Sequence, residues 1–100
     1  MDMREVATPT NPSVVPFYVE SAYAAHAAPL RRWLTARTRD AEAAEDIAQE
    51  AFARLVREAR YGRAPDDPGA WLHRVAANIA TSRGRRISVA DRHLGHLAPP

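Results

Sequence analysis

The stretch AEDIAQEAFARLVREA, residues 44–59, decides the fold. Its apolar residues recur at the i, i+3, i+4, i+7 spacing of one helix face: Ala44, Ile47, Ala48, Ala51, Phe52, Leu55, Val56 and Ala59. Asp40 suits the N-cap of this helix, and the acidic residues that follow favour the positive end of the helix macrodipole. We therefore predict an amphipathic helix of about 19 residues, roughly 28 Å long at the usual rise per residue.

A second helical pattern precedes this stretch, from Phe17 to about Arg37. Its apolar positions recur mostly at helical spacing: Phe17, Tyr23, Ala27, Leu30, Trp33 and Leu34. Pro29 interrupts the pattern, and an internal proline either ends a helix or kinks a longer one. We expect a break near Ala28, followed by a second helical piece.

A third pattern follows the loop YGRAPDDPGA, residues 61–70. Asp67 suits an N-cap, and Pro68 suits the first helical position, where the missing backbone donor has no intrahelical partner. The apolar stripe of this last helix comprises Leu72, Val75, Ala76, Ile79 and Ala80, and we expect the helix to fray around Gly84. Since no segment alternates with period two, we predict an all-α fold, a compact bundle of three to four helices.

The 100 residues are enough for one domain with one modest core. The proline-containing start predicts a flexible tail over residues 1–16, a helical domain over 17–88, and the start of an interdomain linker over 89–100. No apolar run is long enough for a membrane span, the N-terminus lacks a signal-peptide pattern, and there is no cysteine. We therefore expect no membrane association and a cytoplasmic location.

Charge is distributed unevenly along the chain. Residues 31–39 hold four arginines and no acid, residues 40–50 hold five acidic residues and no base, and residues 71–100 hold five arginines against one aspartate. Such segregation indicates two surfaces with different partners, one basic and one acidic.

Catalytic signatures are lacking. His26, His73, His93 and His96 do not form a metal-ligand spacing with carboxylates. The sequence also has no glycine-rich phosphate loop, no cysteine nucleophile and no Gly-x-Ser-x-Gly turn. We predict that the protein is not an enzyme and needs no metal or other cofactor.

Polar residues on the outer face of the acidic helix are the first candidate site. Asp46, Gln49 and Glu50 form a compact set of acceptors with one amide, suited to docking arginines of another helix. The alternative is a solvated face in which Glu50 pairs with Arg54 at i, i+4.

The last helix carries the second candidate site. Asn78 and the outward arginines could contact bases and phosphates, or could simply form a solvated helix end. Trp71 and Tyr61 could stack on an unpaired base, whereas the more common role of a lone tryptophan such as Trp71 is to anchor a loop to the core. The residue pattern leaves these alternatives open.

Together, DAEAAEDIAQEAFARLVREA, the Gly/Pro/Asp loop and AWLHRVAANIATSRGRR resemble region 2 of bacterial sigma-70 family factors, specifically the extracytoplasmic-function (ECF) group. Upstream, HAAPLRRWLTART resembles the first conserved helix of that family, except that His26 stands where tyrosine is common. The resemblance covers roughly residues 17–88.

The resemblance implies a role for each candidate residue. Asp46, Gln49 and Glu50 match the helix that docks on the coiled coil of the RNA polymerase β′ subunit. Trp71, Arg74 and Asn78 match the helix that contacts the minus-ten promoter element. The loop over residues 60–69 matches the segment that receives a base flipped out of the single-stranded non-template strand. The complete DNA-binding set is Tyr61, Arg63, Trp71, Arg74, Asn78, Ser82, Arg83, Arg85 and Arg86, the last arginines following the DNA backbone.

Further expectations come from the same resemblance. ECF factors are usually held inactive by an anti-sigma factor, so we expect such a partner. They also carry a second, C-terminal helical domain that binds the minus-thirty-five element, so we expect the chain to be an excised region of a longer factor. Two other hypotheses remain: a sigma-like module that binds only an anti-sigma protein, and a basic helical protein that prefers duplex DNA.

Overall fold

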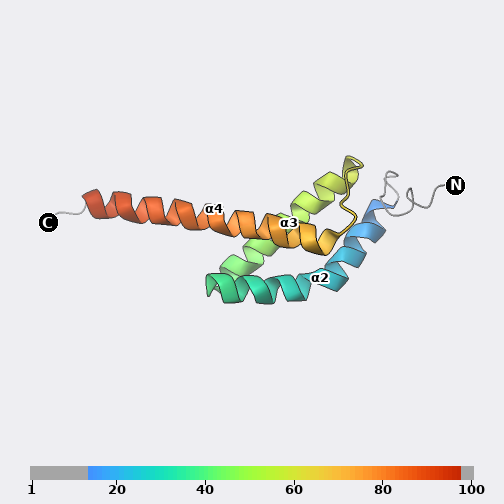
Figure 1. Ribbon diagram of the computed structural model, residues 1–100, viewed down its shortest axis with the longest axis horizontal. Coiled ribbons are helices and arrows are strands. Elements are labelled where there is room, and N and C mark those ends of the chain that lie inside the picture. Colours follow the sequence, from blue (N-terminus) through green and yellow to red (C-terminus); the bar gives the residue numbers. More distant parts are fainter. Residues whose placement is uncertain (1–13, 98–100) are drawn as a thin grey trace.

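The computed structural model describes residues 14–97, and their side chains as far as Arg86. Three helices account for most of this range (Figure 1): α2 Val15–Thr38, α3 Ala41–Arg60 and α4 Pro68–Leu97. All three pack against one another, and the described residues contain no strand. The prediction of a small all-α bundle is confirmed.

Helix α3 supplies the largest share of the core. Seven of the eight residues in its predicted stripe are buried, the exception being the half-buried Val56. The predicted cap is also present, because the Oδ1 atom of Asp40 accepts hydrogen bonds from the backbone N–H groups of Glu42 at 3.0 Å and Ala43 at 3.2 Å. The main core then adds residues of the other two helices: Ala22, Ala27, Leu30 and Leu34 of α2, and Leu72, Ala76 and Ile79 of α4.

Helix α2 is continuous through Pro29, so the expectation of a break near Ala28 is wrong. Figure 1 shows α2 bent instead, between its blue N-terminal part and its teal C-terminal part. Proline removes one intrahelical hydrogen bond and crowds the carbonyl four residues earlier, which bends a helix. Ala28 and Pro29 are exposed while Ala27 and Leu30 are buried. The core therefore holds the helix together on the side opposite the proline.

The start of α2 lies two residues before the predicted domain boundary. Val15 is buried and Pro16 lies in the first turn, so these two residues belong to the helix and not to the predicted tail. Proline is tolerated in a first turn because the N–H groups there have no intrahelical acceptor. Residues 1–13 of the predicted tail lie outside the described residues. Two members of the predicted apolar pattern are exposed, Phe17 by 71 % and Tyr23 by 48 %.

Helix α4 begins as predicted and ends later. It starts at Pro68, and the Oδ1 atom of Asp67 accepts a hydrogen bond from the backbone N–H of Ala70 at 3.1 Å. The helix continues to Leu97, so the expectation of fraying around Gly84 is wrong, and the predicted linker boundary at residue 89 falls within α4. A single helical glycine costs only about 1 kcal/mol relative to alanine. The C-terminal half of α4 projects beyond α2 and α3 (Figure 1).

Gly69, in the first turn of α4, lies against the His26 side chain of α2. A Cβ atom at this position would lie 2.7 Å from the Cε1 atom of His26. An alanine at residue 69 would therefore require the imidazole of His26 to move. Gly84 differs, because a Cβ atom there would meet no atom within 4 Å.

These two glycines give opposite predictions for the same substitution. Gly69→Ala should lower the free energy of unfolding by about 1–3 kcal/mol through overpacking against His26. Gly84→Ala should raise it by up to about 1 kcal/mol through helix propensity. Urea unfolding followed by circular dichroism measures both. The loss in Gly69→Ala should shrink in a His26→Ala background, and an unchanged loss would contradict the contact.

Candidate functional site

Asp46, Gln49 and Glu50 lie within one turn of α3, as their spacing predicts. Asp46 and Gln49 are exposed, whereas Glu50 is half-buried. Asp46 forms no ion pair or hydrogen bond through its side chain with any described residue. The structure therefore groups the three residues but gives them different surroundings.

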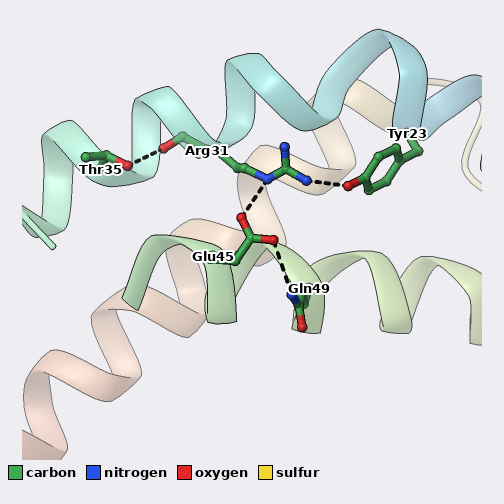
Figure 2. Close-up of polar contacts among 5 residues, drawn as sticks. All are labelled: Tyr23, Arg31, Thr35, Glu45 and Gln49. Atoms are coloured by element: carbon green, nitrogen blue, oxygen red, sulfur yellow. Dashed lines mark hydrogen bonds and ion pairs between the residues drawn. The ribbon is translucent and has the colours of Figure 1, made fainter. Parts of the chain in front are cut away.

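Gln49 belongs to a polar chain that joins α3 to α2 (Figure 2). Its Nε2 atom donates a hydrogen bond to the Oε1 atom of Glu45 at 3.2 Å. The Oε2 atom of Glu45 forms an ion pair with the Nε atom of Arg31 at 2.7 Å, and Arg31 also donates a hydrogen bond to the hydroxyl of Tyr23. This chain orients the Gln49 amide on the surface between α2 and α3.

Glu50 faces the other neighbour, α4. Its Oε1 atom pairs with Arg54 of α3 at 2.9 Å, and its Oε2 atom pairs with Arg83 of α4 at 3.1 Å. Desolvation alone would raise the pKa of Glu50, but the hydrogen bonds and charges of both arginines outweigh it and hold the pKa below its ordinary value. Both carboxylate oxygens of Glu50 are thus occupied within the chain.

The predicted DNA-binding residues of α4 fall mainly on one face. Trp71, Arg74, Asn78, Ser82 and Arg85 follow one another at intervals of three or four residues. All but Trp71 are exposed. Trp71 is half-buried and packs against the main core, so one side of its ring anchors the start of α4. This stripe extends for about 21 Å along the helix.

Tyr61 and Arg63 lie in the loop between α3 and α4. The Tyr61 ring is 68 % exposed, and the guanidinium carbon of Arg63 lies 5.1 Å from its centroid. The Nε atom of Arg63 donates a hydrogen bond to the Oε2 atom of Glu58 at 2.9 Å, and its Nη2 atom donates one to Oε1 at 3.3 Å. These bonds lower the pKa of Glu58 and raise that of Arg63. The Arg63 guanidinium therefore lies over one face of the Tyr61 ring, and the residue as a whole stays largely exposed.

The same loop is fastened to the start of α2. The hydroxyl of Tyr18 donates a hydrogen bond to the carbonyl of Pro65 at 2.6 Å. Burial, together with the charge of Asp66, raises the pKa of Tyr18 to about 12. Ala64 is buried in a small apolar cluster with Val15 and Ala59. The loop thus has a defined conformation before any ligand binds.

A surface groove of about 400 Å³ lies along the contact between α3 and α4 and is lined by residues of both predicted sites. It is lined by Glu50, Arg54, Asn78, Ile79, Ser82, Arg83 and Arg86. Glu50, predicted for the polymerase, therefore lies beside four residues predicted for DNA. The structure does not separate the two sets as completely as the sequence suggests.

Several residues of these surfaces were not candidates from the sequence. Arg54 was named only as the i, i+4 partner of Glu50, and the structure contains that pair. Arg31 and Tyr18 have no such local signal, because each contacts a residue of another element.

Other kinds of site are lacking in the part of the chain that the structure describes. Among residues 14–86, whose side chains the structure describes, there is no group of three or more histidine, cysteine or acidic residues that could hold a metal ion. Within residues 14–97, no helix is both long and apolar enough to cross a membrane.

Comparison with protein families identifies the family of the chain. A family model described as Sigma-70 region 2 matches residues 22–89, which include α3, the loop, most of α2 and most of α4. No curated protein and no solved structure matches the chain significantly. The chain therefore belongs to the sigma-70 region 2 family, whose members bind core RNA polymerase and promoter DNA in transcription initiation.

Proposed function

We propose that the protein is the region 2 domain of an ECF-type sigma factor, which docks on the β′ coiled coil through α3 and captures the single-stranded minus-ten element through α4 and the preceding loop. The observation that carries the proposal is the exposed stripe of α4. Its arginines, Asn78 and Ser82 share one face that begins beside the Tyr61 loop. Amides and arginines are the side chains that contact base edges and phosphates.

The loop supports capture of an unpaired base. Strand opening without ATP must be offset by binding energy that exists only in the open state. Stacking of one base on an aromatic ring is worth about 1–3 kcal/mol. The exposed ring of Tyr61 offers such a surface, and the Tyr18 bond to Pro65 reduces the entropy lost when the loop binds.

The acidic residues of α3 support a protein partner with a basic surface. Asp46 would repel phosphate, so a DNA contact at this position is unfavourable. Asp46 and Gln49 are exposed and suited to arginine donors. In this proposal the protein is a non-enzymatic specificity subunit that acts in the cytoplasm, needs no cofactor, and is held inactive by an anti-sigma factor.

Asp46→Asn and Gln49→Ala should each weaken binding to core RNA polymerase by about tenfold, because each removes one arginine acceptor from the docking surface. Fluorescence anisotropy with labelled protein and core polymerase measures the effect. Glu20→Gln is the matched control, since it removes an exposed carboxylate from α2. Equal affinity of all variants would contradict the α3 assignment. These positions are preferable to Glu50, whose replacement also disturbs Arg54 and Arg83.

Asn78→Ala should reduce the preference among single-stranded minus-ten oligonucleotides, whereas Arg85→Ala should weaken binding to all of them. The reason is that an amide reads base edges while an arginine on the backbone does not. Titrations at several salt concentrations should show a salt slope smaller by about 0.7 for Arg85→Ala alone. If both variants reduce binding equally for every sequence, the division of roles along α4 is wrong. A preference of the wild-type protein for duplex over single strands would favour a general DNA binder.

A further inference from the structure

The groove between α3 and α4 concentrates positive charge around one carboxylate. Arg54 enters from α3, Arg83 and Arg86 enter from α4, and Glu50 lies between Arg54 and Arg83. Three arginines against one glutamate leave the groove with an excess of two positive charges. The excess is not neutralised by other acidic residues of the groove lining.

The polar side chains of α4 continue the groove in the direction of the helix. Asn78, Ser82 and Arg86 are four residues apart and line the same wall. This wall offers an amide, a hydroxyl and a guanidinium, all of which donate hydrogen bonds to phosphate oxygens. The groove therefore has the donors and the charge for an anion with several oxygens.

We propose that this groove binds a phosphate of the nucleic-acid backbone, that Arg54 is an additional DNA contact, and that Glu50 is an internal anion that competes with the phosphate for Arg54 and Arg83. The proposal rests on the proposed function, since it assumes that α4 meets DNA. It differs in placing a residue of α3 on the DNA and in giving Glu50 an inhibitory role toward it.

The exposure of these side chains explains why a DNA phosphate can compete with the Glu50 carboxylate for Arg54 and Arg83. The side chains of Glu50, Arg54 and Arg83 are 38 %, 45 % and 36 % exposed, so water screens their pairing. Such pairs contribute little net stability and exchange partners readily. Arginine pairs with phosphate in the same forked geometry as with carboxylate. A DNA phosphate can thus replace the Glu50 carboxylate without breaking the packing of α3 on α4.

Glu50→Gln tests the competition in the complete chain without polymerase. The glutamine keeps the size of the side chain and removes the charge. The affinity of the Glu50→Gln variant for a fluorescein-labelled single-stranded oligonucleotide of the minus-ten type should rise by about threefold to tenfold. A change of this size is in the range of the free energy of one exposed ion pair. Glu20→Gln is the control, because it gives the same change in net charge away from the groove. Its affinity should change by less than about twofold.

Arg54 provides the second arm of the experiment. Arg54→Ala in the Glu50→Gln background should reduce the gain in affinity and lower the salt slope by about 0.7, the loss of one phosphate contact. Competition with inorganic phosphate distinguishes a site for a phosphate of the nucleic-acid backbone from a site for a free anion. At millimolar concentration, inorganic phosphate should displace the strand only weakly.

Three results would overturn the proposal: equal gains in Glu50→Gln and Glu20→Gln, no gain in either, or a gain that Arg54→Ala leaves intact. Displacement of the strand by inorganic phosphate at micromolar concentration would also overturn it, because the site would then take a free anion. Failure of the wild-type protein to bind any strand, even with core polymerase present, would instead contradict the proposed function. The two failures are therefore distinguishable.

Discussion

The apolar stripe of α3 is the constraint on which the rest of the structure depends. Ile47, Ala51 and Leu55 are almost completely buried, and α3 packs against both other helices. Burial of one Ile or Leu side chain contributes about 1.5–3 kcal/mol, so this stripe fixes the rotation of α3 about its axis. Once the rotation is fixed, it determines which neighbouring helix each polar residue beside the stripe faces.

This rotation divides the acidic residues of α3 between two edges. Toward α2, Glu45 pairs with Arg31 and orients Gln49; toward α4, Glu50 pairs with Arg83. Asp46 lies between these edges and is exposed. A single helix thereby presents an exposed carboxylate at Asp46 and a carboxylate at Glu50 that pairs with arginines of α3 and α4.

Much of the fold could be predicted because its signals are local. The stripe of α3, the caps at Asp40 and Asp67 and the proline at the start of α4 depend only on residues within a few positions of one another. The continuity of α2 through Pro29 could not, because it depends on burial of Ala27 and Leu30 by other helices. The same holds for the position of Glu50, whose second partner is 33 residues away in the sequence.

The candidate site shows the same difference. The helical spacing of Arg74, Asn78, Ser82 and Arg85 correctly predicts a shared face. Support of the loop by Tyr18 and the place of Arg54 beside Asn78 arise only from packing between elements. Exposed ion pairs are individually weak, so breaking the internal pairs of these surfaces costs little stability.

The most direct measurement of the central claim is binding to a library of fluorescent single-stranded oligonucleotides that vary at each minus-ten position, with and without core RNA polymerase. A region 2 domain that captures the non-template strand predicts a defined sequence preference that is stronger in the presence of polymerase. Binding to all strands alike, with polymerase present and the helical fold intact, would contradict it.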